Sequence, residues 1–249
     1  MTSIGDQHIS GVKVERMSLR GAWVTGVEVR SGLFGRSRMR DVQLVDLDIS
    51  GDLRNVVVNG VDIAPLVEAE LDRRMPERAK MRPEDSDGFR EAWAILERLW
   101  DATVARARTF PEEALHRSVD DEWSFVQTLR HLNFASACWV DRMILGEVSP
   151  WLPLDLPSDD MSPWDGFGWD RDARPSLDDV LALRDERRAT VRGVLGSLTD
   201  ATLAVRSTRT EPGWPQETDF PVQECLRIVL DEEWEHRLYA ERDLTALEQ

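Results

Sequence analysis

Several residue types that would define a protein class are scarce in this chain. Its 249 residues include two cysteines, one tyrosine and four histidines, and only Lys13 and Lys80 of the 31 basic residues are lysines. The two cysteines, Cys138 and Cys225, lie in apolar helical patterns and indicate free thiols rather than the disulfide framework of a small secreted domain. The first residues, Met1–Asp6, lack the basic patch and apolar stretch of a signal peptide. We therefore expect a cytoplasmic protein.

Long apolar runs and an excess of positive charge are also missing. No apolar run approaches the length of about eighteen residues that a membrane-spanning helix needs. The formal net charge is -16 at pH 7, whereas nucleic acids and anionic membrane surfaces bind proteins through basic patches. We expect neither as a partner. A chain of 249 residues can bury one large core or two modest ones.

An apolar residue occupies every fifth position in the first part of the chain. The register is unbroken from Ile9 to Ile49, and it resumes at Leu53 after one residue drops out. The apolar positions are Ile9, Val14, Leu19, Val24, Val29, Phe34, Met39, Leu44, Ile49, Leu53, Val58 and Ile63. Neither a helical period of about 3.6 nor a strand period of about 2 fits this pattern, whereas a solenoid with five residues per face does.

The repeat resembles the pentapeptide-repeat family, although most of that family's Asp/Asn and Leu/Phe consensus is absent. The resemblance implies a right-handed quadrilateral β-helix of about three coils. The open end of such a β-helix must be covered, and Pro65 followed by apolar residues predicts a capping helix over Ala64–Arg74. We therefore expect a first domain over residues 1–75, followed by a charged linker over Met75–Asp87.

From Ser86 onward the spacing of apolar residues is typical of helices. The pattern predicts four helices, of which the first is about twenty residues long. The first contains Phe89–Val104. The second and third begin after the N-cap residues Ser124 and Ser176, and the fourth extends from Pro221 to Leu247. A long connection between the second and third helices would let them run parallel, which predicts a four-helix bundle over residues 84–249.

Two stretches between the predicted helices are expected to be irregular, Gly146–Pro175 and Ser207–Phe220. The first carries Trp151, Trp164, Phe167 and Trp169. Loops of this length inside compact domains are often lids or walls of a site. The alternative is that these aromatic rings only plug one end of the bundle.

Glu232 and His236 stand four residues apart in the fourth predicted helix, so they share one face a turn apart. A carboxylate and an imidazole at this spacing can hold one metal ion, as the H-E-x-x-H helix does, and His131 of the second predicted helix is a third candidate ligand. Taken alone, this spacing is common in helices and usually belongs to a solvated helix face.

Two longer segments resemble the DinB superfamily. They are Glu122-Trp123-Ser124 leading into Thr128–Leu132, and Glu232–His236 leading into Tyr239–Leu244. The resemblance covers about Ser86–Glu248 and implies an up-down-down-up bundle with metal ligands on the second and fourth helices. It assigns His131, Glu232 and His236 as ligands. Where many members have three histidines this chain has Glu232, and a His-Glu-His set resembles the mycothiol-dependent maleylpyruvate isomerase branch.

Two imidazoles and one carboxylate leave open coordination positions on a divalent ion, as in catalytic zinc sites. A thiol bound there would be deprotonated at neutral pH. We therefore expect a divalent-metal-dependent thiol S-transferase or thiol-dependent isomerase that acts on an electrophilic small molecule through a metal-bound thiolate. Zinc is the expected metal, although nickel, iron or manganese also suit these ligands. A low-molecular-weight thiol is the expected cosubstrate.

Residues around the ligands suggest further roles. Tyr239 follows His236 by three residues and is a candidate proton donor or substrate contact, the alternative being a packed ring with a satisfied hydroxyl. Arg242 could meet a substrate carboxylate, the alternative being an ion pair within the bundle. We expect the acidic neighbours of the ligands to face water or nearby arginines. These neighbours are Asp231, Glu233 and Glu235.

Other function classes stay open at this point. One is a non-catalytic binding or regulatory protein, with a structural metal site and the β-helix as its interaction surface. Another is a structural protein whose metal site has decayed. DNA mimicry by the β-helix would require acidic rows, and this one is rich in arginine instead. The arginines are Arg16, Arg20, Arg30, Arg36, Arg38 and Arg40. The sequence leaves the thiol, the electrophile and a homodimeric state open.

Overall fold

The structure is a computed structural model that describes residues 25–27, 29, 33–159, 161, 168–215 and 219–248. Contacts between Cα atoms divide the chain into two compact units, Met1–Asp52 and Leu53–Gln249. None of the helices in the described residues combines the length and apolar character of a membrane span.

The backbone of the described repeats enters the left-handed region at a regular interval. Positive φ angles occur at Gly26, Arg36, Asp41, Asp46, Gly51, Asn55 and Gly60, and also at Asn59. From Arg36 to Gly51 the interval is five residues, and each of these residues follows an apolar repeat residue by two positions. Glycine, aspartate and asparagine tolerate this conformation better than other residues. The predicted five-residue period is therefore visible in the backbone.

The predicted β-helix itself is not observed. No strand is present in the described residues before Val57, and the repeat residues Phe34, Met39 and Leu44 are 68%, 63% and 56% exposed. The described segment therefore has the corners of the predicted coil without its hydrogen-bonded strands or apolar core. The repeats from Ile9 to Val24 lie outside the described residues.

The second unit begins with a short hairpin and a helix. Strand β1 (Val57–Val58) pairs antiparallel with β2 (Val61–Asp62) across an Asn-Gly turn, the residue pair that such two-residue turns favour. Helix α1 spans Ala64–Arg74, the residues for which a capping helix is predicted, and η1 (Pro76–Met81) follows it. None of the residues of α1 is buried, and its capping role stays a prediction.

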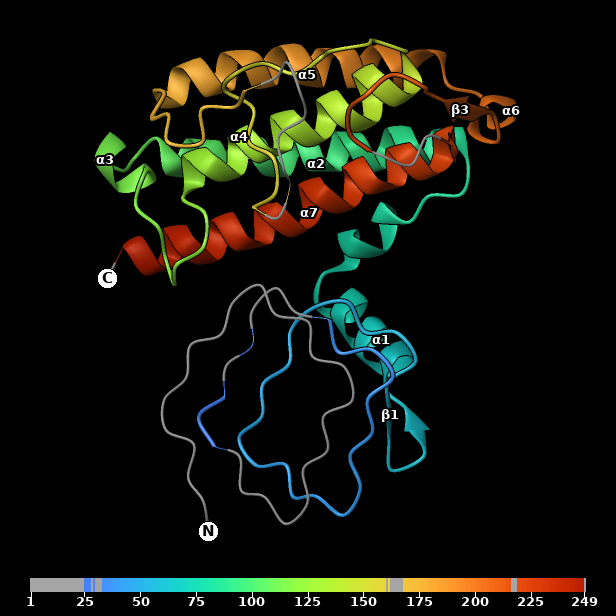
Figure 1. Cartoon of the computed structure of the whole chain (residues 1–249), viewed down its shortest axis with the longest axis vertical. Helices are drawn as coiled ribbons and strands as arrows, with labels where there is room; N and C mark the ends of the chain where they lie inside the picture. The colour runs from blue at the N-terminus through green and yellow to red at the C-terminus, as the bar shows by residue number, and fades with distance from the viewer. Residues whose placement is uncertain are drawn as a thin grey trace. The chain divides into compact units, whose positions relative to one another are not determined.

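Four long helical segments form the bundle. They are α2 (Ser86–Ala107), α4 (Phe125–Ser136) continued by the π-helix η2 (Ala137–Ile144), α5 (Leu177–Ser197) and α7 (Val222–Leu247). Figure 1 shows α4 and α5 running in the same direction and opposite to α2 and α7, which is the predicted up-down-down-up topology. Two short helices, α3 (Glu112–Leu115) and α6 (Asp200–Leu203), were not predicted.

Side-chain caps determine where the helices begin. Ser124 and Gln127 form a capping box at the start of α4, and Ser176 accepts from the Asp179 N–H at the start of α5. Both predicted N-caps are therefore confirmed. Pro221 stands one position before α7 rather than at its first helical residue, because it ends a strand.

The interior of the bundle carries one apolar cluster around Trp93 and Leu230 and another around Trp100 and Leu132. A third cluster joins the long connection to the bundle. In it the buried Trp151 and Met161 pack with Phe134, Ala137 and Cys138, and Trp169 packs against its edge. Trp151 thus packs against the second helical segment, and whether the aromatic rings of the connection form a wall of a site or a plug stays a prediction. Trp164 and Phe167 lie outside the described residues.

Two features of the bundle correct the sequence analysis. The stretch Ser207–Phe220 is bounded by strands, since β3 (Arg206–Thr208) pairs antiparallel with β4 (Asp219–Pro221). Three-residue strands are too short to give an alternating apolar pattern. The second helix also changes to π-helical geometry at Ala137, and no proline or glycine in Ala137–Ile144 marks the change. Cys138 and Cys225 are free, as predicted, and both are buried, which agrees with their apolar helical patterns.

Candidate metal centre

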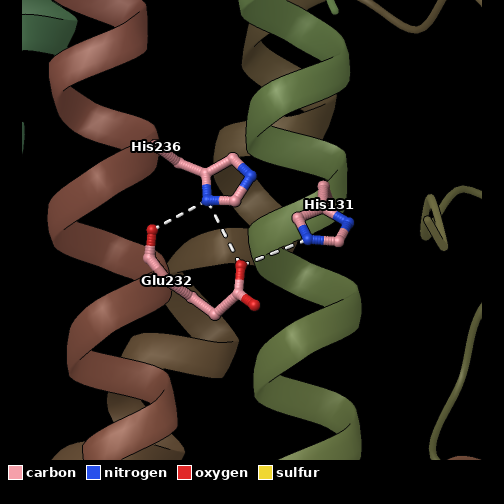
Figure 2. A group of neighbouring side chains, drawn as sticks. All are labelled: His131, Glu232 and His236. Atoms are coloured by element: carbon pink, nitrogen blue, oxygen red, sulfur yellow. Dashed lines mark hydrogen bonds and ion pairs between the residues drawn. The ribbon is translucent and has the colours of Figure 1, made fainter. Parts of the chain in front are cut away.

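The structure brings His131, Glu232 and His236 together. His131 comes from α4, and the other two come from successive turns of α7 (Figure 2). One ligand atom of each residue lies within 4.8 Å of the others. The Glu232 Oε2 atom is 3.3 Å from His131 Nε2 and 3.2 Å from His236 Nδ1. The geometry is that of a group able to hold a metal ion, and the role of each residue as a ligand stays a prediction.

The tautomer of His131 follows from its neighbours. Its Nδ1 lies 2.9 Å from the carbonyl oxygen of Leu156. A carbonyl can only accept, so Nδ1 must carry the proton, and Nε2 of the neutral ring has a lone pair. This lone pair faces the Glu232 carboxylate at 3.3 Å. Two acceptors facing each other at this distance call for a proton or a cation between them.

The donor atoms are suited to a metal cation. A separation of 3.3 Å between His131 Nε2 and Glu232 Oε2 matches the edge of a tetrahedron around an ion with bonds of about 2.0 Å. His236 Nδ1 donates to the backbone carbonyl of Glu232 at 2.9 Å, so its Nε2 is also left with a lone pair. Each imidazole therefore has one nitrogen fixed by a backbone carbonyl and the other available to a metal, the usual arrangement of metal-binding histidines.

Electrostatics favour the forms of these side chains that bind metals. Burial lowers the pKa of His236, against the opposing effect of the Glu232 charge, so the neutral imidazole is favoured. Burial acts to raise the pKa of Glu232, but a protonated His131 that donates to it, and the positive charge of His131 and His236 when they are protonated, hold that pKa below its ordinary value. A metal ion bound to neutral imidazoles would supply the same positive charge beside Glu232. A neutral imidazole and an ionised carboxylate are the states in which these groups coordinate a cation.

Aromatic rings surround the imidazoles. The Trp123 ring lies 4.5 Å from His131 and is stacked 6.0 Å from His236, between ring centroids. Phe134 lies 6.2 Å from His131. The long connection contributes Asp159, which accepts from Trp123 Nε1 at 3.4 Å. The connection therefore forms part of the wall of the site. Trp123 belongs to the motif Glu122-Trp123-Ser124, but its place in the sequence alone predicted no role for it.

Tyr239 and Arg242 lie at the edge of this aromatic group. The Tyr239 ring meets His236 edge-on at 6.0 Å and is 43% exposed. Burial, and then the nearby charges of Glu235 and Glu122, raise the pKa of Tyr239. Arg242 lies over the Tyr239 ring and forms ion pairs with Glu122 at 2.5 Å and Asp243 at 2.7 Å. The charge of Arg242 is thus matched within the bundle, which is the alternative that the sequence left open.

The acidic neighbours of the ligands differ in their surroundings. Glu233 is buried and forms an ion pair at 2.5 Å with the buried Arg184 of α5. Arg184 in turn lies over the Trp100 ring, whose Nε1 donates to the Glu233 carbonyl. Burial raises the pKa of Asp231 to about 6. The expected pairing with an arginine therefore holds for Glu233, inside the core rather than at the surface.

A comparison with protein-family models gives one finding. The model described as the DinB superfamily matches residues 95–240, more than half of the chain, and this range contains all three residues of the candidate centre. No curated protein and no solved structure matches the chain.

Proposed function

The chain belongs to the DinB superfamily, and from this membership and the geometry of the site we propose that it is a divalent-metal-dependent thiol S-transferase or thiol-dependent isomerase. One observation carries the proposal. His131 Nε2 faces Glu232 Oε2 at 3.3 Å, while Nδ1 of the same ring donates its proton to the Leu156 carbonyl. His131, Glu232 and His236 would hold the metal, and zinc suits two imidazoles and one carboxylate.

A divalent ion held by these residues would lower the pKa of a coordinated thiol, so that the thiol ionises at neutral pH. The chain supplies the surroundings. Trp123 and Phe134 cover the imidazoles with apolar surface and limit the access of water. Glu232 keeps its charge close to both imidazoles and offsets part of the charge of the ion. The reaction class is attack by a small thiol on an electrophilic small molecule.

The charges at the edge of the site narrow the substrate class. Arg242 is the cation next to Tyr239, and Glu122 and Asp243 already balance it. The Arg242 side chain therefore offers no excess positive charge to a thiol or electrophile that carries a carboxylate. We propose an uncharged or weakly charged thiol, and the His-Glu-His set is consistent with the mycothiol-dependent branch. Free, buried cysteines fit a reducing compartment such as the cytoplasm.

Metal analysis of the purified chain tests the proposal. We expect about one equivalent of a divalent metal in the wild-type chain and less than a tenth of that in His131→Ala. Screening of small thiols with an electrophile such as 1-chloro-2,4-dinitrobenzene should then give turnover that chelation removes and zinc restores. Full metal occupancy in His131→Ala would show that the ligand assignment is wrong. A loaded protein without thiol-dependent turnover would leave a structural metal site as the better interpretation.

The second candidate function is a binding or regulatory role in which the repeats form the interaction surface. The left-handed corners, spaced by five residues from Arg36 to Gly51, favour the proposed right-handed quadrilateral β-helix over residues 1–75. In a β-helix the amides of residues 9–52, which precede the β1–β2 hairpin, would be protected from hydrogen exchange. Exchange of these amides at the rate of an unfolded chain would rule the β-helix out. We also propose that residues 84–249 fold alone, which circular dichroism of that fragment would test.

A further inference from the structure

Arg130 immediately precedes the proposed ligand His131 and is completely buried, with 0% of its surface exposed. Its guanidinium donates to four backbone carbonyls of the connection between η2 and α5. The acceptors are Leu154 at 2.7 Å, Ala173 at 2.9 Å, Arg171 at 3.3 Å, and Asp170. Hydrogen bonds from a charged donor are about twice as strong as neutral ones. Arg130 thus fixes two separate parts of the connection to α4.

A second arginine, Arg171, belongs to the connection itself and ties its two parts together. Arg171 donates to the carbonyl oxygens of Pro157 at 3.2 Å, Ser158 at 3.0 Å and Met161 at 3.1 Å. Leu156 therefore lies between a residue held by Arg130 and two residues held by Arg171. Unlike Arg130, Arg171 is about one-third exposed, so its loss is less damaging to folding.

Leu156 links the connection to the proposed centre. Its N–H donates to the backbone carbonyl of Arg130 at 3.2 Å, and its own carbonyl accepts from His131 Nδ1 at 2.9 Å. We propose that Arg130 and Arg171 are positioning residues of the metal centre. They hold the Leu156 carbonyl where it selects the tautomer and orientation of His131, and so present Nε2 to the ion. This inference rests on the proposed function, because it needs His131 to be a ligand.

The arrangement couples the metal to the connection in both directions. An ion on Nε2 withdraws electron density from the ring, which makes Nδ1–H a better donor to Leu156. Metal binding therefore stabilises the contact between His131 and the Leu156 carbonyl. By thermodynamic linkage, a well-held connection raises the affinity for the metal by the same factor.

Arg142 provides a matched control. It is also 0% exposed and belongs to the same helical segment. It also donates to backbone carbonyls outside its helix, those of Val148 at 3.3 Å, near the start of the same connection, and of Glu211 between β3 and β4. Neither loop residue bonds to a residue of the proposed centre. Loss of Arg142 should therefore resemble loss of Arg130 in its effect on folding but not in its effect on the metal.

The test measures zinc affinity of the full chain after chelation, by competition with an indicator dye, in the wild type and in Arg130→Met, Arg171→Met and Arg142→Met. We expect Arg130→Met to weaken zinc binding by about 10- to 100-fold, the usual effect of removing support for a ligand. Arg171→Met should weaken it less, and Arg142→Met should leave it unchanged. If Arg130→Met does not fold, the zinc affinity of Arg171→Met relative to the wild type tests the inference.

Hydrogen exchange gives a second measurement that does not depend on activity. Zinc should slow exchange of the amides of residues 152–158 in the wild type and in Arg142→Met, and should do so much less in Arg130→Met. Wild-type zinc affinity in both Arg130→Met and Arg171→Met would overturn the inference, as would an equal loss in Arg142→Met. A wild-type chain that binds no zinc through His131 would instead overturn the proposed function itself.

Discussion

Glu232→Gln distinguishes a metal ligand from a structural ion pair, because the two interpretations predict opposite effects on the metal-free chain. In the first interpretation, the unprotonated Nε2 of His131 faces Glu232 Oε2 at 3.3 Å. Glutamine has nearly the same shape and can offer an N–H to that nitrogen. It would replace two opposed acceptors with a donor and an acceptor, a gain of about 0.5–1.5 kcal/mol for a neutral hydrogen bond. The metal-free variant should then be slightly more stable than the wild type.

In the second interpretation, His131 is protonated and forms an ion pair with Glu232. Removing one partner of a buried ion pair costs about 3–5 kcal/mol. The His131 side chain is 6% exposed and that of Glu232 is 30% exposed, so the lower end, about 3 kcal/mol, applies. In a chain of this size 1 kcal/mol shifts Tm by about 2–4 °C. The ion pair thus predicts a Tm lowered by about 6–12 °C, and the metal ligand predicts one raised by about 1–6 °C.

The same variant measures the contribution of the carboxylate to metal binding. Zinc at about 1,000 times its Kd would stabilise the wild type by about 4.1 kcal/mol, or about 8–16 °C in Tm. Glu232→Gln should lose most of this shift, because a neutral amide is a poorer zinc ligand than a carboxylate. Scanning calorimetry of chelated protein, with and without zinc, measures both effects. Glu235→Gln on the same helix is the control, since Glu235 is outside the ligand group. A lowered metal-free Tm, or a full zinc shift in Glu232→Gln, would rule out Glu232 as a metal ligand.

Three further predictions follow from the described residues. The cobalt-loaded chain should bind 2-mercaptoethanol more tightly than 3-mercaptopropionate. Glu122→Gln should shift this preference toward the anion by about two- to fivefold, because it removes one of the two carboxylates beside Arg242 and leaves Asp243 as its partner. An unchanged preference would contradict the assigned charge balance. Burial raises the pKa of Cys138 well above its usual range and that of Cys225 to about 12. Iodoacetamide at pH 8 should therefore label both thiols only after the chain is unfolded in urea. Fast labelling of the folded chain would count against their burial. Burial also raises the pKa of Asp155 to about 6, so the folded chain binds a proton there that the unfolded chain releases near pH 4. The free energy of unfolding, measured in urea, should therefore fall for the wild type relative to Asp155→Asn as pH rises from about 4 to 6, and parallel curves would refute the shift.

Features set by local sequence were predictable. The N-caps at Ser124 and Ser176 are side chains that bond to a backbone N–H three residues away, so sequence alone identifies them. The five-residue corners are also local, because glycine or a short polar residue follows each apolar repeat residue at most of them. Stacking of the coils depends on contacts between repeats, and the five-residue period alone does not determine whether these contacts form.

Features set by distant backbone groups were not predictable. The carbonyl of Leu156 determines the tautomer of His131, but every residue has a carbonyl and nothing in the identity of Leu156 marks it. The π-helical end of the second helix, Ala137–Ile144, depends on its surroundings in the same way. Arg130 is the exception. A cation inside an apolar helix pattern, next to a candidate ligand, is a signal that the sequence analysis could have used.

Glu232 and Glu233 show why a candidate ligand needs the structure as well as the motif. They are adjacent on α7, about 100° apart around the helix axis, and identical in type. Glu233 meets Arg184, 49 residues away, whose guanidinium satisfies its charge and leaves no role for a metal. Glu232 meets His131, 101 residues away, whose available nitrogen is itself an acceptor. The first carboxylate has its counter-charge within the chain, whereas the second would obtain one from the proposed metal. Glu233 is a structural carboxylate because its partner is Arg184, and Glu232 is a proposed ligand because its partner is His131.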